Sequence, residues 1–370
     1  MHLNLPFKKL NDLSQILQYH KSPIGPSFCE YKEFTHSLCL GQDSEYFKFD
    51  KFSLNHTFCL ELENALVYQG AHFIVDPNPN ISFERRAGGA TGYSPSNTKQ
   101  SVLLSQVGID TCFEDNFAWD NIFPEIPTSN IQHMKGTYVV LTGVQAQKLF
   151  FHFIYDGISR CAMLEKYGYN LQDPTGFIIS QEPTEYQKAW FEKLGILDRI
   201  VVAPGNSFLL CEKLIVPSLS YLSLDAVGYI KSVFHVPYPK ARKKIFIGRG
   251  KATLGRHMEN ELELFERLAA LGFEYCTMDG LSIHEQASIF ASASHIVAPH
   301  GAALSNIIFC KKGTKVLEFF GDNYLNGVYY VLCNQLGLKH FNCIGTAIGS
   351  NDYKSNFVIP SDVDLDAFLL

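Results

Sequence analysis

The sequence predicts an α/β protein whose C-terminal part is a doubly wound parallel sheet. Strand-like and helix-like segments alternate five times between residues 244 and 343, which is the pattern of consecutive β-α-β units. The chain has 370 residues, of which 46% are hydrophobic and 18% charged, so it can form two domains with ordinary cores. Ligands of open parallel sheets bind at the carboxyl ends of the strands. Functional side chains are therefore expected at those ends.

The elements of this C-terminal part have recognisable start and stop signals. Strands are expected at 244–247, 273–277, 295–298, 315–319 and 339–343, and helices at 257–271, 282–293, 302–310 and 324–336. Ser282 and Glu285 form a capping box, which satisfies free N–H groups at the start of a helix. Gly272 and Gly337 follow two of the helices, and glycine commonly ends a helix because it adopts the left-handed conformation.

The N-terminal part combines a β-rich irregular region with a second α/β region. Residues 22–110 contain short strand-like runs separated by turn signals such as residues 76–80 (Asp-Pro-Asn-Pro-Asn). Further along, strands are expected at 137–141, 177–180, 199–202 and 213–216, and helices at 145–167, 185–194 and 225–234. Residues 237–239 (Pro-Tyr-Pro) then break the chain. We therefore expect a domain boundary in this region, between residues 228 and 229.

The composition argues against several classes of protein. The formal net charge is −6, whereas a protein that binds nucleic acid usually carries a basic surplus. The ten cysteines include no C-x-x-C pair, which argues against a zinc site or a disulfide framework and for a cytoplasmic location. No run approaches the ~20 apolar residues of a transmembrane segment. The apolar face of residues 3–17 either packs on the domain or binds weakly to the inner face of a membrane.

Polar residues that suit a phosphorylated ligand follow the strands of the C-terminal part. Arg249 and Arg256 follow the first strand, His300 follows the third, and Glu318 lies near the end of the fourth. The planar guanidinium group suits phosphate oxygens, and the helix that starts after His300 offers backbone N–H groups at its positive end. A carboxylate can accept hydrogen bonds from both hydroxyls of a ribose. A nucleoside diphosphate would satisfy this set.

These residues belong to a longer series of motifs. In order, the series is residues 247–249 (Ile-Gly-Arg), Arg256, 260–261 (Asn-Glu), 285–286 (Glu-Gln), 300–302 (His-Gly-Ala), Asn306, Phe309 and Glu318. Together with residues 136–149, His152, Asp156, 187–195 and 213–217, these motifs make residues 55–345 resemble glycosyltransferase family 61. The chain departs from the family pattern at Gly248, where serine is common, and in lacking the N-terminal membrane anchor of eukaryotic Golgi members.

The resemblance implies a GT-B-like architecture, in which two Rossmann-like domains face a cleft. Residues 1–228 would form the acceptor-side domain, with its additional β-rich irregular segments, and residues 229–345 the nucleotide-sugar-binding domain. Residues 346–370 would form a tail that packs back on the N-terminal domain. The implied reaction is the inverting transfer of a hexose or pentose from a UDP-sugar to a hydroxyl of a glycan. The implied partners are a nucleotide-sugar donor and a glycan acceptor, in the synthesis of surface polysaccharide or glycoprotein glycans.

The motifs and the resemblance together define a candidate nucleotide site. The residues expected to bind the diphosphate are Arg249, Arg256, His300, Gly301, Ala302 and Asn306, and Glu318 is expected to bind the ribose. Thr277, Asp279, Asn260 and Glu261 are candidates for loop or ligand contacts. The alternatives are a helix-capping role for His300, surface ion pairs for the two arginines, and a structural acceptor role for Glu318.

The catalytic base is expected in the N-terminal domain, because the acceptor approaches the sugar from the face opposite the phosphate. His152 and Asp156 are four residues apart, so on a helix they share a face. Either could take the proton of the acceptor hydroxyl: histidine because its pKa lies near neutrality, and aspartate because it is ionised there. The alternative is a buried pair that holds the helix to its sheet.

We expect no metal and no other cofactor. Residues 362–366 (Asp-Val-Asp-Leu-Asp) imitate the acidic motif of metal-dependent transferases, but they follow Pro360 and Ser361, where acidic residues commonly begin a helix. Positive side chains can replace a divalent cation at the leaving group. Two other classes stay open: a non-catalytic carbohydrate-binding or scaffold protein, and a dinucleotide-dependent oxidoreductase suggested by the partial motif Gly248-x-Gly250.

Overall fold

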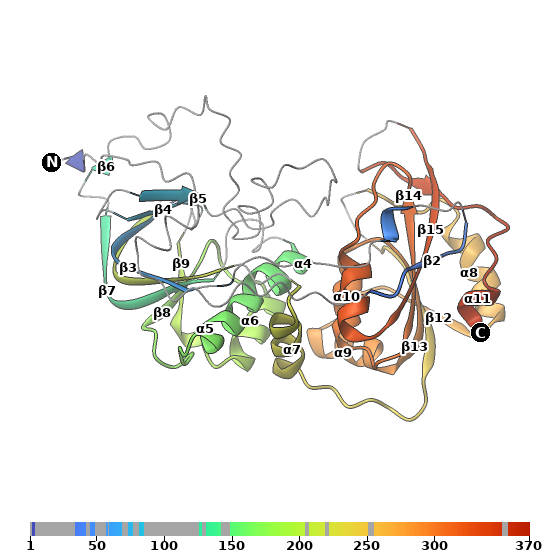
Figure 1. Ribbon diagram of the computed structural model, residues 1–370, viewed down its shortest axis with the longest axis horizontal. Coiled ribbons are helices and arrows are strands. Elements are labelled where there is room, and N and C mark those ends of the chain that lie inside the picture. The colour runs from blue at the N-terminus through green and yellow to red at the C-terminus, as the bar shows by residue number, and fades with distance from the viewer. Residues whose placement is uncertain are drawn as a thin grey trace. The chain divides into compact units, whose positions relative to one another are not determined.

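The chain forms two compact units (Figure 1). The computed structural model describes residues 2–3, 34–41, 45–48, 57, 59–68, 73–76, 81–84, 126–127, 131–141, 149–203, 207–218, 222–250, 255–349 and 354–370. The first unit contains residues 2–3 and the described residues from 57 to 233, and the second contains the described residues from 34 to 48 and from 234 onward. The unit boundary thus falls five residues after the expected one, because helix α7 (Leu224–Val233) packs against α5 (Ser159–Lys166) of the first unit.

The first unit is built on a seven-stranded mixed sheet with the order β5-β4-β3-β10-β7-β8-β9. The strands are β3 (Cys59–Tyr68), β4 (Phe73–Asp76), β5 (Ile81–Glu84), β7 (Ile131–Val140), β8 (Gly176–Ile179), β9 (Ile200–Val202) and β10 (Phe208–Pro217). β10 pairs antiparallel with β3 and parallel with β7, so the sheet has an antiparallel half and a parallel half. A separate pair joins β1 (His2–Leu3) to β6 (Ile126–Pro127). The α/β prediction is confirmed here, but only half of the sheet has the parallel pairing of a Rossmann-like fold.

Helices lie together on one side of this sheet (Figure 1). They are α4 (Phe150–His152), η4 (Phe153–Ile158), α5, α6 (Glu185–Lys193), η5 (Leu197–Arg199) and α7. The single helix expected at 145–167 is interrupted by η4, a wide π-helical turn of six residues. π-Helical turns of this kind are frequent at functional sites. Residues 145–148, most of the apolar segment 3–17 and the residues between 85 and 125 lie outside the described part of the chain.

The second unit is built on a mainly parallel sheet with the order β12-β11-β13-β14-β15-β16. The strands are β11 (Lys243–Ile247), β12 (Phe273–Cys276), β13 (Ala293–Pro299), β14 (Lys315–Gly321), β15 (Lys339–Ala347) and β16 (Phe357–Val358). The first five are parallel, and β16 is antiparallel to β15. Strand order reverses between β11 and β13, which is the switch point where open α/β sheets bind ligands. The doubly wound prediction is thus confirmed for this unit.

The helices of the second unit differ from the predicted ones mainly at their starts. They are α8 (Glu261–Ala270), α9 (Ile283–Ser292), η6 (Ala302–Phe309), α10 (Val328–Leu336) and α11 (Asp366–Leu369). Both bonds of the predicted capping box at Ser282 are present. α8 starts four residues later than expected, because Met258 bridges to Phe357. The helix expected after His300 is a 3₁₀-helix, η6.

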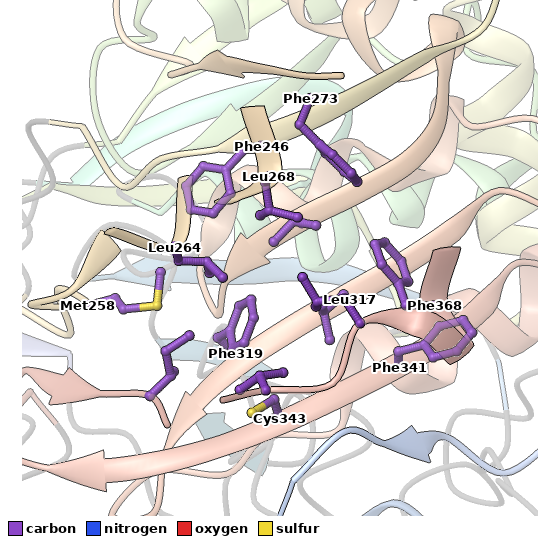
Figure 2. Close-up of a cluster of buried hydrophobic side chains, with 14 of the residues drawn as sticks. Phe246, Met258, Leu264, Leu268, Phe273, Leu317, Phe319, Phe341, Cys343 and Phe368 are labelled. Carbon is purple, nitrogen blue, oxygen red and sulfur yellow. The ribbon is translucent and has the colours of Figure 1, made fainter. Parts of the chain in front are cut away.

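The C-terminal tail contributes to the core of the second unit, which differs from its expected packing on the N-terminal domain. Phe357, Val363 and Phe368 are buried in a cluster with residues of the sheet. Figure 2 shows Phe368 beside Phe273 and Phe341, with ring centroids 6.3 and 5.3 Å away. Burial of these apolar side chains holds the tail in place. The acidic motif within it starts α11, as expected: Asp364 Oδ1 accepts a hydrogen bond of 2.9 Å from the backbone N–H of Asp366.

A segment from the N-terminal part of the sequence also belongs to the second unit. We call residues 34–41 and 45–48 the N-terminal strap. Its strand β2 (Leu38–Cys39) pairs parallel with β15, and its Phe47, only 1% exposed, packs against Phe320 and His340. The prediction that residues 1–228 form one domain missed this crossing, because the contacts that cause it join residues about 300 positions apart.

None of the helices in the described ranges is long and apolar enough to cross a membrane.

Candidate functional site

Two arginines, Arg249 and Arg256, lie at the switch point of the second sheet. Arg249, which follows β11, donates from Nε to the carbonyl oxygen of Gly255 (2.6 Å) and from Nη1 to that of His300 (2.9 Å). The guanidinium carbon of Arg256 lies 4.6 Å from the ring centroid of Tyr324. Among the described residues, neither arginine forms an ion pair, and Nε of Arg256 is buried without a hydrogen-bond partner. Both side chains are half-buried, and half-buried cations without counterions indicate a site for an anion.

The electrostatics and the backbone at these arginines point to the same conclusion. Burial and the nearby charge of Arg256 lower the pKa of Arg249 to about 10, so Arg249 is still charged at neutral pH. Arg256 has a backbone φ of 59°, in the left-handed region that side chains other than glycine rarely adopt. Its N–H donates to the carbonyl oxygen of Lys354 (2.9 Å). Strained backbone of this kind is commonly found where function requires it.

His300 lies at the end of β13 and pairs with Glu318 of the neighbouring strand β14. Nδ1 of His300 is 2.5 Å from Oε1 of Glu318, whose side chain is completely buried. The His300 ring stacks on Phe320 with centroids 5.2 Å apart, and in the described part of the chain its Nε2 has no hydrogen-bond partner. Nε2 is therefore the nitrogen that His300 can present to a ligand.

The pKa shifts of His300 and Glu318 favour the uncharged forms of both groups. Burial raises the pKa of Glu318 well above its ordinary value. Burial, followed by the charges of Arg256 and Arg249, lowers the pKa of His300 well below its ordinary value. The predicted contact of Glu318 with a ribose does not fit this geometry, because the second carboxylate oxygen, Oε2, accepts from Nε2 of His340 at 2.9 Å. With both oxygens engaged and the side chain buried, Glu318 orients His300.

The His-Gly-Ala turn brings backbone N–H groups to the same place. A Cβ atom on Gly301 would lie 2.6 Å from Nη1 of Arg249, so a larger residue would displace the guanidinium group. Ala302 is exposed and starts η6. The first N–H groups of a helix have no partner within the helix and can bind an anion. The structure thus brings together five of the six residues expected at the diphosphate.

The sixth, Asn306, is buried and serves the packing of η6. Its Nδ2 donates to Oε1 of Gln286 (2.9 Å) and to the carbonyl oxygen of Ala303 (3.1 Å). Gln286 in turn donates to the carbonyl oxygen of Leu281 (3.0 Å). Asn306 therefore joins η6 to α9 and supports the turn, although its Oδ1 is buried without a partner.

The four candidates for loop or ligand contacts divide into two pairs. Asn260 bonds through both ends of its amide to the backbone of Ile359, which ties α8 to the tail. Glu261 accepts from the hydroxyl of Tyr275 at 2.7 Å. Both therefore make loop and helix contacts. Thr277 and Asp279 follow β12 at the carboxyl edge of the sheet.

Two glycines after β11 allow close approaches at this edge. A Cβ atom on Gly248 would lie 2.0 Å from the hydroxyl of Tyr275, so a serine at this position would require the tyrosine ring to move. Gly250 has a φ of 56°, and a Cβ atom on it would lie 2.2 Å from Oδ2 of Asp279. The two glycines thus let these loops pack closely, a role that does not depend on a dinucleotide.

His152 and Asp156 form a hydrogen-bonded pair in the first unit. Nδ1 of His152 is 2.6 Å from Oδ2 of Asp156, with the side chains 18% and 0% exposed. Burial works to lower the pKa of His152, but the charge and hydrogen bond of Asp156 outweigh it and raise the pKa above its ordinary value. Since Nδ1 faces Asp156, Nε2 is the nitrogen left to exchange a proton with a ligand.

Arg160 supports this pair from the next helical turn. It is completely buried, and its Nε donates to the backbone oxygen of Asp156 at 2.7 Å. A second bond, from Nη1 to the carbonyl oxygen of Pro217, ties the turn to β10. Oδ1 of Asp156 is buried, and it has no hydrogen-bond partner among the residues that the structure describes. The pair is thus fixed against the sheet while the His152 ring keeps an exposed edge, so the structural and catalytic interpretations are compatible.

Comparison with protein families confirms the resemblance inferred from the motifs. Residues 150–317 match the family described as Glycosyltransferase 61. The matched region contains the His152–Asp156 pair and the arginine and histidine residues at the switch point, and it ends one residue before Glu318. None of the curated proteins matches the chain. The family match supports a glycosyltransferase, an enzyme that acts on a sugar donor and an acceptor.

Two residues of the site were missed by the sequence analysis. His340 lies within the expected strand 339–343, where a histidine in a buried parallel strand is a detectable signal. Ser37 accepts from Asn342 Nδ2 at 2.6 Å and lies 2.7 Å from Nδ1 of His340. No local pattern marks Ser37, because only the docking of the N-terminal strap brings it to the site.

Proposed function

We propose that this protein is an inverting glycosyltransferase that moves a sugar from a UDP-sugar to a hydroxyl of a glycan, without a divalent metal. The observation that carries the proposal is the pair of arginines, Arg249 and Arg256, without carboxylate partners among the described residues, beside His300 at the switch point. A diphosphate supplies the negative charge that this arrangement lacks. The GT-B arrangement and a surface-glycan acceptor are parts of the same proposal.

On the donor side, the second unit stabilises the leaving group. The bond between the anomeric carbon and the phosphate oxygen breaks, and its electron pair goes to the diphosphate. The two guanidinium groups, the N–H groups at the start of η6 and Nε2 of His300 lie where that charge develops. Donors already in position stabilise developing charge most effectively, since they need no rearrangement during the reaction.

On the acceptor side, His152 removes the proton of the attacking hydroxyl. The hydroxyl oxygen forms the new bond to the anomeric carbon, and its proton passes to Nε2 of His152. Asp156 is completely buried and its Oδ2 is bonded to Nδ1 of the ring. It therefore orients His152 and stabilises the imidazolium that forms.

Calorimetry and a turnover assay test the proposal. UDP should bind the purified protein, and a UDP-sugar should release UDP when a glycan acceptor is present. Arg249→Met should weaken UDP binding about 10- to 100-fold, because hydrogen bonds to charged groups contribute about 1.5–3 kcal/mol. Lys311→Gln, which removes one exposed positive charge from the same unit, should bind like the wild type.

The two other classes give different results in the same assays. UDP binding without turnover on any acceptor would favour a scaffold protein. Binding of a nicotinamide dinucleotide in preference to UDP would favour an oxidoreductase. Folded protein that binds neither would overturn the proposal.

A further inference from the structure

A continuous chain of buried hydrogen bonds leads from the N-terminal strap to His300. It runs from Asn342 through Ser37 to His340 and from there through Glu318 to His300. The successive distances are 2.6, 2.7, 2.9 and 2.5 Å. All five residues are at most 8% exposed. They come from three segments of the sequence: β15, the strap, and the β13–β14 region.

The direction of the donors along this chain follows from the chemistry of its groups. The amide of Asn342 donates to Oγ of Ser37, so the hydroxyl proton of Ser37 has Nδ1 of His340 as its acceptor. Burial lowers the pKa of His340 to about 3, so this ring is neutral at physiological pH. With Nδ1 accepting, its one proton is on Nε2. His340 therefore donates to Oε2 of Glu318.

This direction determines the state of His300. Because Oε2 of Glu318 already accepts a hydrogen, a carboxyl proton on Glu318 lies on Oε1 and faces Nδ1 of His300. Burial favours this protonated form of Glu318 and the neutral form of His300, as their shifted pKa values indicate. With Nδ1 accepting, the one hydrogen of the neutral ring is on Nε2, which is therefore a donor.

We infer that Ser37 and His340 are positioning residues that keep Nε2 of His300 in its hydrogen-donating form, as binding of a phosphate oxygen requires. The inference rests on the proposed function for the identity of the ligand, but the proton arrangement is a property of the protein alone. The strap would thus couple the N-terminal part of the chain to the nucleotide site. His300 touches the ligand, whereas Ser37 and His340 act only through Glu318.

Removing the hydroxyl of Ser37 should reverse the direction in which the hydrogen bonds of this network are donated. In Ser37→Ala nothing donates to Nδ1 of His340, so the ring can place its proton on Nδ1 and accept from Glu318 at Nε2. The carboxyl proton then lies on Oε2, and Oε1 accepts from Nδ1 of His300. Nε2 of His300 becomes an acceptor, which repels a phosphate oxygen.

Nitrogen NMR of ¹⁵N-histidine-labelled full-length protein reads this state directly, with His300 assigned by the loss of its signals in His300→Gln. In the wild type without ligand, Nε2 of His300 should be protonated. In Ser37→Ala it should be unprotonated, and UDP should bind about tenfold more weakly by calorimetry. Ser37→Thr keeps the hydroxyl and should behave as the wild type.

Two further variants complete the test. Thr35→Ala is the matched control, because the strap bonds to Asn334 there through the backbone of Thr35, and it should change neither readout. Asn342→Asp replaces the amide donor with a carboxylate, which only accepts hydrogen bonds when it is ionised. It should therefore reverse the donor direction of the network, as Ser37→Ala does.

The outcomes separate this inference from the proposed function. A protonated Nε2 and unchanged UDP affinity in Ser37→Ala would overturn the inference and leave the proposed function intact. Conversely, a wild type that does not bind UDP, with the predicted change at Nε2 in Ser37→Ala, would overturn the proposed function and support the proton arrangement.

Discussion

The two units each contain a histidine that is hydrogen-bonded through Nδ1 to a completely buried carboxyl group. The pKa values of these two histidines are nevertheless shifted in opposite directions. The pKa of His152 is raised, and that of His300 is lowered. Burial opposes the charged form in both. At His152 the carboxylate of Asp156 outweighs burial, whereas at His300 two arginines add to it. The surroundings, and not the pair itself, determine whether the histidine is suited to take up a proton or to contact an anion.

The largest effect is expected at the histidine proposed as the base. His152→Ala should lower turnover about 10²–10⁴-fold, the usual contribution of a general base, while UDP binding is unchanged because the nucleotide residues are all in the second unit. Initial rates and calorimetry on the same preparation measure the two effects. Normal turnover in His152→Ala would show that the His152–Asp156 pair has only a structural role.

Removing Arg256 should bring the pKa of His300, in its pair with Glu318, closer to that of His152 in its pair with Asp156. Arg256→Met should weaken UDP binding about 10- to 100-fold and raise the pKa of His300, because the arginine charge that lowers this pKa most is gone. Calorimetry and NMR titration of His300 measure the two effects. If the pKa of His300 stays the same in this variant, the charge of Arg256 does not lower it, and the comparison drawn above fails.

Removing the charge of Asp156 should move the pH dependence of turnover. The base acts when deprotonated, so turnover falls as the pH drops through the pKa of His152, which Asp156 raises. Asp156→Asn keeps an acceptor for Nδ1 but lowers that pKa, so the acid limb of the profile should move to lower pH, with a rate about tenfold lower. An acid limb at the same pH would show that another group controls it.

The smallest effect concerns stability. The His152 pKa is raised on folding, so its ion pair contributes stability in full below an unfolded pKa of about 6.5, and this contribution is lost as the pH rises through the folded value. The His300 pKa is lowered, so this residue has the opposite effect and destabilises the fold as the pH falls below about 6.5. Thermal melts of the wild type and His152→Ala across this range should converge at high pH. A constant difference would indicate lost packing.

Much of the second unit was predictable from the sequence, because its signals are local. Each parallel strand is a short apolar run, three of the four predicted helices have a cap or a terminating glycine, and right-handed crossovers place all strand ends at one edge. Arg249 and His300 could therefore be assigned to one site. The continuous helix expected at 145–167 was wrong in detail, because Phe153–Ile158 form a π-helical turn.

The first unit was less predictable, since antiparallel pairing between distant strands leaves a weak local signal. Within residues 22–110, where short separate strand-like runs were expected, Cys59–Tyr68 form one continuous strand, β3, whose partner β10 lies about 150 residues later. The role of Glu318 was also beyond the sequence. A glutamate at a strand end fits ribose binding or an internal hydrogen bond equally well until its burial is known.

The sequence by itself determined the order of strands and helices in the second unit, the residues at its strand ends and the spacing of His152 and Asp156, because these depend on neighbours along the chain. Only the tertiary structure decided how protons are arranged at the site. Burial of Glu318, the distances from His300 and His340 to its two oxygens, and the docking of Ser37 join positions about 300 residues apart. Long-range contacts of this kind set pKa values and tautomers, since these depend on every charge and donor within a few ångströms.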